Sequence, residues 1–244
     1  MEHEIWFAAL LNRLLGGAVS SLLAAIGLPP ADLGHPIPNY VAMEVFVILL
    51  ILTSVLLLRR GLSVENPGRF QQVMEVLVEF NQGLAEQIIG HEGRRHVAIL
   101  GTLGVFILLC NLLGLVPTLE TPTAHIQVTL GCAVSVFIYY NFQGVRRHGV
   151  LGYLRTFCGP MLWIAVIMLP VEIISNLARV LSLSVRLYAN MFAGQLLEQV
   201  FTGLIPVFVP ALLMVMHVFV SFVQTYIFML LPAVYVSMAV AEEH

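Results

Sequence analysis

The stretch that decides the fold reads Glu172-Ile-Ile-Ser-Asn-Leu-Ala-Arg179-Val-Leu-Ser-Leu-Ser-Val-Arg186-Leu-Tyr-Ala-Asn190. It lies inside a long apolar region, Met161 to Ala241, whose four charged side chains are Glu172, Arg179, Arg186 and Glu198. The region divides into two runs of about 40 residues, and as a helix each would measure about 60 Å, twice the roughly 30 Å of hydrocarbon in a bilayer. We therefore expect two long helices that are steeply tilted in a membrane.

The overall composition excludes the soluble classes of protein. Of the 244 residues, 59% are hydrophobic and 10% are charged, whereas soluble domains have roughly 45–50% and about 25%. All basic side chains other than His are scattered Arg residues, so there is no basic face for nucleic acid. The three cysteines, Cys110, Cys132 and Cys158, are widely spaced and predict neither a disulfide framework nor a metal site. We expect an all-α integral membrane protein without a metal, a cofactor or a nucleic-acid partner.

The apolar runs predict about five membrane-crossing helices, near residues 40–58, 97–119, 126–142, 161–200 and 203–241. The loop arginines fall between the first and second spans and between the third and fourth. The loops on the other side of the membrane, between the second and third spans and between the fourth and fifth, contain no arginine. Because arginine collects in cytoplasmic loops, we expect an outer N-terminus and a cytoplasmic C-terminus, in a bacterial inner membrane. Residues 1–39 are expected to form an outer-side segment ahead of a single membrane domain, 40–244. Within that segment, residues 5–28 are either an interfacial helix or a partial span.

Residues 67–89 predict a cytoplasmic amphipathic helix. Asn66 and Pro67 supply a cap and a first-turn proline, and apolar side chains then recur at helical spacing as far as Gly90. Such a helix typically lies on the membrane or on the protein's own body, and a docking surface for a partner is the alternative. His91, His96 and His148 occur among the cytoplasmic arginines, where solvated side chains are expected.

Each charge inside a span requires a physical reason, because it costs about 2.5–3.5 kcal/mol on insertion scales. Projected as a helix, the first long run carries a polar stripe within about 40° of Arg186, formed by Glu172, Ser175, Arg179, Ser182 and Asn190. Ser184 and Gln195 lie on the opposite face, and Glu198 lies between the two faces. Arg179 can pair with Glu172, whereas Arg186 has no carboxylate at helical spacing. Since a guanidinium stays charged at any accessible pH, we expect a membrane partner that supplies a carboxylate.

His217, Ser221 and Gln224 share one face of the last predicted helix. Two interpretations of His217 are open at this point. A single histidine in a packed helix is often simply hydrogen-bonded to a neighbour. Coupled to Gln195 or Glu198 on an adjacent helix, it would instead mark an aqueous ion path, since titratable groups within a bilayer usually do so.

The segment Ser182-Leu-Ser-Val-Arg186-Leu-Tyr-Ala-Asn190-Met-Phe-Ala-Gly194 strongly resembles the signature of subunit a of the rotary F-type ATP synthases. Other matching pieces are Asn111-Leu-Leu-Gly-Leu-Val-Pro117, Pro122-Thr-Ala, Val128-Thr-Leu130, Glu172, Phe70-Gln71 and the closing stretch from Gln224 to Glu243. The resemblance extends in order from Tyr40 to the C-terminus.

The resemblance implies a stator subunit that conducts protons beside a ring of c subunits and that is not an enzyme by itself. Arg186 would be the essential arginine that faces the c-ring carboxylate and separates two aqueous half-channels. Stator b subunits and the remainder of the ATP synthase would be further partners, together with membrane lipid. The implied ion path comprises Glu172, Asn190, Gln195, Glu198, His217 and Gln224, with Arg179, Ser182 and Ser221 in support.

The chain departs from the pattern of its relatives at two places. Gln195 stands where relatives frequently have an acidic residue or His, so Glu198, His217 or a water chain could take that role. His125 and Gln127 stand where relatives commonly have Asp and Asn.

Two other classes of protein were weighed against this one. A self-contained transporter or channel would work without a partner ring, and a structural scaffold would tolerate removal of the Arg186 charge. The Arg186 segment argues against both.

Overall fold

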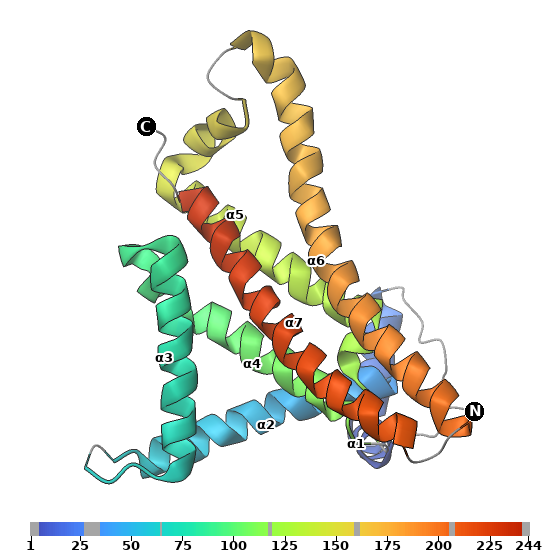
Figure 1. The fold of residues 1–244 in the computed structure, drawn as a ribbon. Coiled ribbons are helices and arrows are strands. Elements are labelled where there is room, and N and C mark those ends of the chain that lie inside the picture. The colour runs from blue at the N-terminus through green and yellow to red at the C-terminus, as the bar shows by residue number, and fades with distance from the viewer. Residues whose placement is uncertain are drawn as a thin grey trace.

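The computed structural model describes residues 5–26, 35–63, 65–116, 119–158, 162–204 and 208–240, and every regular element in these ranges is a helix (Figure 1). This confirms the predicted all-α class. In chain order the elements are α1 (Trp6–Ile26), α2 (Asn39–Gly61), α3 (Arg69–Ile89), η1 (His91–Arg95), α4 (Val97–Leu113), η2 (Pro122–Ala124), α5 (Ile126–Cys158), α6 (Leu162–Leu204) and α7 (Phe208–Val240).

Four segments of the described chain are long and apolar enough to cross a membrane: Asn39–Gly61, Ile126–Val150, Val166–Gly203 and Phe208–Val240. The second predicted span, 97–119, begins at Val97 as expected, but its helix α4 ends at Leu113 rather than at Leu119. Beyond Leu113 the backbone changes to tight turns in which Gly114 N–H bonds to Asn111 O and Leu115 N–H to Leu112 O. The helix therefore has 17 residues and is shorter than the other four.

Helix α5 continues well past the predicted span end at Phe142. It bends at Gly149, whose φ of 72° lies in the left-handed region that glycine adopts without strain. After the bend the chain turns back on itself, and the ring of Tyr153 lies directly against Gly144. A side chain at Gly144 would occupy the position of that ring.

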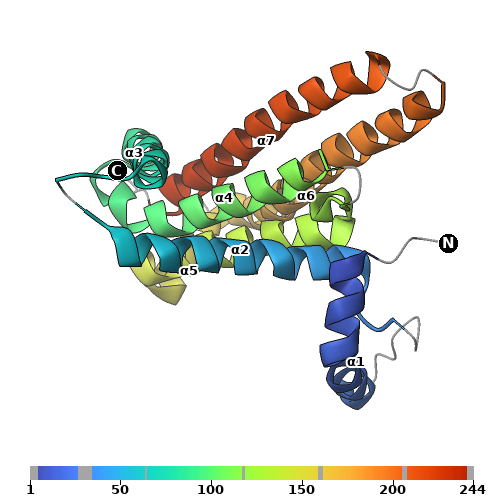
Figure 2. The same cartoon turned by 90° about the horizontal axis from the view of Figure 1, so that it is seen from below.

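Helices α6 and α7 form a long hairpin whose helices run obliquely to α2 in both views (Figures 1 and 2). Helix α6 has 43 residues and would measure about 65 Å at 1.5 Å per residue. One side of α6 is buried against α5 and α7 through Leu183, Leu187 and Met191, which join Tyr140 and Phe228 in the largest core cluster. The tilt of both helices in a membrane stays a prediction.

Helix α3 runs across one end of the bundle (Figure 1) and packs through its C-terminal half against α4 and α7. Leu84 and Ala85 are buried there, which confirms contact with the protein's own body, while Phe70 and Val73 remain exposed. The predicted start of this helix is wrong. It begins at Arg69 with Gly68 in the cap position and without a side-chain cap, because Asn66 lies in a bend and Pro67 precedes the helix.

The arginine-bearing segments η1, α3 and the far end of α5 are joined by ion pairs. Arg94 Nε lies 2.6 Å from Glu86 Oε1, and Arg147 Nη1 lies 3.1 Å from Glu92 Oε1. The expectation of a solvated His96 is wrong. The ring is 4% exposed, and its Nδ1 lies 2.8 Å from the Tyr139 hydroxyl on α5. Burial lowers the pKa of His96, Glu92 acts in the opposite direction, and Arg95 lowers it further.

Helix α1 contacts α2 and runs away from its end, across the direction of the bundle (Figure 2). Asn12 holds this corner together, since its Nδ2 donates to Ile37 O at 3.1 Å and its Oδ1 accepts from Ile37 N–H at 2.9 Å. Ile5, Ala8 and Met43 are buried between the two helices. This crosswise course favours the interfacial interpretation of the N-terminal helix over a partial span.

Gly93→Ala tests the contact between η1 and α3. An added Cβ would lie 2.6 Å from Ala85 C and 3.0 Å from Glu86 N, and backbone atoms cannot swing aside. We expect a loss of about 1–3 kcal/mol in the free energy of unfolding, the usual cost of overpacking, measured by unfolding of the purified protein in detergent. Gly83→Ala, which meets nothing within 4 Å, should be neutral or stabilising. Equal stability of the two variants would contradict the packing described here.

Candidate functional site

Arg186 lies on a face of α6 that no other helix of the described chain covers. Its side chain is exposed, as are those of Leu181 and Val185 nearby. Among the described residues, none forms a hydrogen bond or an ion pair with the guanidinium. The arginine thus has no anionic partner in its own helix, as the sequence predicted, and none from the rest of the described chain either.

A group of polar side chains, called here the His217 cluster, lies between α4, α6, α7 and the loop around η2. Its members are Asn111, Thr121, Thr123, Asn190, His217, Ser221 and Gln224. Asn190 Nδ2 of α6 donates to Gln224 Oε1 of α7 at 2.9 Å. The Thr123 hydroxyl donates to Asn111 Oδ1 at 2.6 Å. Four separate segments therefore meet at one polar region within an otherwise apolar bundle.

His217 occupies the centre of this cluster and is 7% exposed. Its Nε2 lies 3.2 Å from the backbone oxygen of Asn111, and because a carbonyl can only accept, Nε2 carries the proton. In the neutral ring, Nδ1 is then the acceptor. A Cβ on Gly194 of α6 would lie 3.2 Å from Nδ1. The glycine therefore leaves space beside this nitrogen on the side that faces α6.

Three buried polar atoms of the His217 cluster lack a hydrogen-bond partner in the described chain: Asn111 Nδ2, Thr121 Oγ1 and Gln224 Nε2. Leaving such a group unsatisfied costs about 1–3 kcal/mol. Buried polar atoms of this kind are normally bonded to ordered water. The cluster therefore has the donors and acceptors that a chain of water molecules needs.

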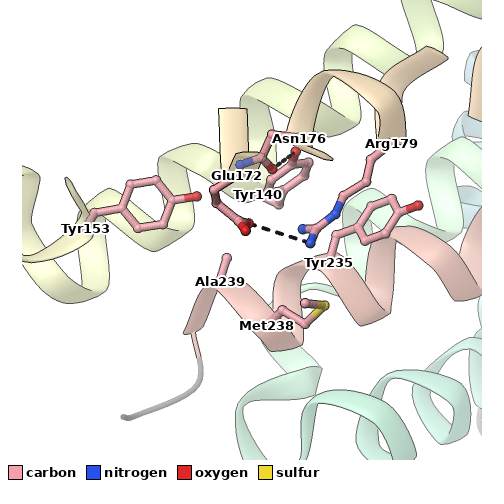
Figure 3. Close-up of a pocket in the computed structure, with 8 residues that line it drawn as sticks. All are labelled: Tyr140, Tyr153, Glu172, Asn176, Arg179, Tyr235, Met238 and Ala239. Atoms are coloured by element: carbon pink, nitrogen blue, oxygen red, sulfur yellow. Dashed lines mark hydrogen bonds and ion pairs between the residues drawn. The ribbon is translucent and has the colours of Figure 1, made fainter. Parts of the chain in front are cut away.

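A second polar region, called here the Glu172 pocket, lies where the beginning of α6 meets α5 and the end of α7 (Figure 3). It has a volume of about 200 Å³ and is lined by Tyr140, Tyr153, Glu172, Asn176, Arg179, Tyr235, Met238 and Ala239. Arg179 Nη2 lies 3.8 Å from Glu172 Oε1, which confirms the predicted pair. The Arg179 guanidinium also lies over the Tyr235 ring, 5.4 Å from its centroid.

Tyrosine hydroxyls form hydrogen bonds that fix the side chains around the Glu172 pocket. Tyr140 donates to Asn176 Oδ1 at 2.8 Å, and Tyr153 donates to Asn141 Oδ1 at 2.9 Å. Burial raises the pKa of Tyr153, with Arg179 acting to lower it and Glu172 to raise it. The phenol therefore stays protonated near neutral pH and remains a hydrogen-bond donor.

The structure brings some of the predicted site residues together and leaves others apart. Asn190 and Gln224 are bonded directly, and Glu172 is paired with Arg179. The Ser221 hydroxyl donates to His217 O within its own helix at 2.7 Å. Ser182 is exposed close to Arg186, while Gln195 and Glu198 are half-buried. The part of the chain that is described holds no group of three or more His, Cys, Asp or Glu side chains suited to a metal ion.

Sequence reasoning missed several polar side chains that the helices bring into contact. Asn111 and Thr123 lay within matching motifs, and that was the only signal for them. Tyr235 likewise lay within the matching closing stretch, and Tyr140 gave no signal, since a polar ring within an apolar run is unremarkable before its partner is known. The predicted second polar face of α6 is confirmed at Ser184, whose hydroxyl lies 3.1 Å from that of Thr129 on α5.

Comparison with known proteins gives one consistent family. The family model described as ATP synthase A chain matches residues 41–237. The chain is 43% identical over 244 residues, all of both chains, to an ATP synthase subunit a of Koribacter versatilis. It is 45% identical over 233 residues to the subunit of Solibacter usitatus, covering 96% of this chain and 99% of that one. It is 38% identical over its whole length, and that of the relative, to ATP synthase subunit a 3 of Pelobacter propionicus.

Tyr140→Phe tests the wall of the Glu172 pocket. Removing the hydroxyl leaves the buried Asn176 Oδ1 without its donor, which should lower the free energy of unfolding by about 1–3 kcal/mol. Unfolding of the purified protein in detergent measures the loss. Tyr188→Phe is the matched control, because Tyr188 stacks on Phe192 and gives no hydrogen bond among the described residues. If both variants unfold alike, the Tyr140 bond contributes nothing.

Proposed function

Because the chain belongs to the family of ATP synthase subunit a, the proton-translocating subunit of the F0 sector, we propose that it provides two aqueous half-channels that carry protons to and from the carboxylate of a c-ring. The family subunit is not an enzyme by itself, and it works within a multi-subunit complex as a multi-pass protein of the inner membrane. Proton flow through the half-channels would couple the ion gradient to rotation and ATP synthesis.

The observation that carries the proposal is the exposed guanidinium of Arg186, which has no partner among the described residues and lies on a helix face that they leave uncovered. A charge in that position costs about 2.5–3.5 kcal/mol in a bilayer unless an anion offsets it. At an effective dielectric constant near 20, an ion pair at 4 Å contributes about 4 kcal/mol, enough to compensate. The c-ring carboxylate would be that anion, which makes α6 the helix beside the ring. Ser182, exposed on the same face, would support this contact.

The His217 cluster would form the half-channel that opens on the outer side. It combines a histidine that can take up a proton with three buried polar atoms suited to water. Asn190 joins it to the helix that carries Arg186, and Gln224 joins it to α7. Gln195 cannot titrate, so His217 would perform the proton exchange, and Glu198 would lie further along the same path. The Ser221 bond to its own helix makes that residue a support of the His217 backbone.

The Glu172 pocket would form the half-channel on the cytoplasmic side. It provides a carboxylate, three phenols and a volume of about 200 Å³ at the opposite end of the α6–α7 pair. Arg179 would hold the Glu172 carboxylate in position from 3.8 Å. Between the two polar regions, Leu183 and Leu187 of α6 are at most 1% exposed and fully apolar. Such a barrier supports the inference that a proton crosses only by riding on the ring past Arg186.

We further propose an outer N-terminus, a cytoplasmic C-terminus and a bacterial inner membrane, with stator b subunits among the partners. The ion pairs Arg94–Glu86 and Arg147–Glu92 gather the arginine-rich segments at one end of the bundle. Because loop arginine collects in the cytoplasm, that end would face the cytoplasm. The His217 cluster would then lie toward the outer side and the Glu172 pocket toward the inner side.

Arg186→Ala should abolish ATP-driven ion pumping in membrane vesicles while the complex still assembles. The reason is that the ring carboxylate loses its counter-charge and the half-channels lose their separation. Pumping is measured at low and high sodium, so that the sodium response identifies the ion, and protons are expected. Thr53→Ala on α2, which removes an exposed hydroxyl bonded only within its own helix, is the control and should retain pumping. An assembled Arg186→Ala complex that pumps normally would contradict the proposal and favour a self-contained transporter or a scaffold.

Single cysteines at His217 and Gln195 should react with small aqueous thiol reagents, in a background without Cys110, Cys132 and Cys158. Reaction is expected because water would reach these positions along the half-channel. A cysteine at Phe228, which is 0% exposed in the apolar core, should stay unreactive. Labelling is followed by mass spectrometry of the assembled complex. Protection of both test positions at the level of the Phe228 control would show that no aqueous path runs there.

A further inference from the structure

A cluster of titratable side chains lies at the end of the bundle opposite η1, and it has no part in the roles described above. The His125 imidazole, between η2 and α5, is bonded through Nε2 to Glu120 Oε1 at 2.6 Å. Tyr40 of α2 stacks on the same imidazole, with ring centroids 4.5 Å apart and planes 23° apart. Glu44 lies one turn further along α2, on the same face as Tyr40. These four side chains are called here the His125 cluster.

Glu44 connects the His125 cluster to the membrane domain. A carboxylate within an apolar helix is expensive, and the titratable group that acts on this one through its charge is the His125 imidazole. The Glu120 carboxylate therefore bonds to the imidazole, whereas Glu44, on a different segment, forms no ion pair with it in the described chain and acts through its charge at longer range. No arginine pairs with either carboxylate among the described residues. Histidine is thus the cationic partner available to both.

The His125 cluster is partly exposed and adjoins the His217 cluster through the η2 segment. The side chains of His125 and Glu120 are 31% and 26% exposed, so solvent reaches the pair without surrounding it. Thr121 directly follows Glu120, and Thr123 lies two residues before His125. The Thr123 hydroxyl bonds to Asn111 Oδ1, and the Asn111 carbonyl accepts from His217 Nε2. Polar side chains of the η2 segment thus lie between His125 and the His217 cluster along the chain, and among them the buried Thr121 Oγ1 lacks a partner in the described chain.

We propose that His125, flanked by Glu120 and Glu44 and held by Tyr40, collects protons from the outer solution and delivers them to the His217 cluster. This inference rests on the proposed function, and it adds the group that first receives the ion. Imidazole changes charge between about pH 5 and 8. Free protons are scarce in this range, so a fixed acceptor at the entrance increases the rate at which protons are captured. The exchange is balanced: His125 binds one proton from outer water to become imidazolium and releases the same proton inward. Glu120 and Glu44 stabilise the imidazolium, and the Tyr40 ring fixes its plane.

The test uses the intact ATP synthase in vesicles, with ATP synthesis driven by an imposed gradient. The pH on the side that supplies protons is varied between about 5 and 8, the range in which imidazole titrates. His125→Gln should lower the synthesis rate by about threefold or more at the alkaline end and little at the acidic end, because abundant protons bypass the collector. Glu120→Gln and Glu44→Gln should shift the profile in the same direction. His148→Gln, at the opposite end of the bundle, is the control and should follow the wild type.

A mobile buffer separates proton collection from a structural role. Millimolar imidazole on the proton-supplying side should restore the alkaline rate of His125→Gln, because it carries protons to the path in place of the side chain. A uniform loss at every pH that imidazole does not restore would overturn the proposal, as would a profile identical to that of the wild type. Glu120→Gln gives an independent reading if His125→Gln assembles poorly. Arg186→Ala in the same vesicles tests the proposed function independently of His125. If Arg186→Ala is inactive and His125→Gln is unaffected, the inference about His125 is overturned and the proposed function stands.

Discussion

A permanent positive charge on an apolar helix is the constraint on which the rest of this structure depends. The Arg186 guanidinium cannot shed its proton, and the described chain offers it no anion. Helix α6 therefore cannot be enclosed on all sides by its own subunit. It buries one face, through Leu183, Leu187 and Met191, against α5 and α7, and leaves the other uncovered, which is where the proposed partner would lie. If neighbouring helices covered α6 on every side, the guanidinium would be buried without a counter-charge.

The remaining polar groups are arranged around this open face. Arg179 and Glu172 neutralise each other on one side of Arg186, and Asn190 joins Gln224 on the other. The two apolar core residues Leu183 and Leu187 separate them. In a medium of low dielectric constant, a gap of this kind is a high barrier for a proton, whereas polar side chains with spare donors and acceptors form a path. Polar and apolar side chains thus alternate along a single helix, an arrangement that supports the proposed route of the proton past Arg186.

Close helix packing makes the polar regions possible. Gly194 of α6 and Gly114 at the end of α4 both lie against the His217 ring, where a Cβ would come within 3.2 and 3.3 Å of its nitrogens. Without side chains at these two positions, three segments approach one imidazole closely enough to orient it. The bend at Gly149 has a comparable effect at the other end, since it turns α5 back so that Tyr153 lines the Glu172 pocket. Small residues therefore determine where the titratable groups meet.

The sequence by itself determined the all-α membrane class, the two long helices, the Arg179–Glu172 pair and the absence of an intrahelical partner for Arg186. These depend on hydropathy and on the 3.6-residue period, which are local properties of the chain. Only the tertiary structure decided that Asn111 bonds to His217, that Tyr140 and Tyr235 line a pocket with Glu172, and that His96 is buried. It also decided that α3 begins at Arg69 and α4 ends at Leu113. These features join residues far apart in the chain or depend on backbone turns, and a linear pattern specifies neither distance nor orientation between helices.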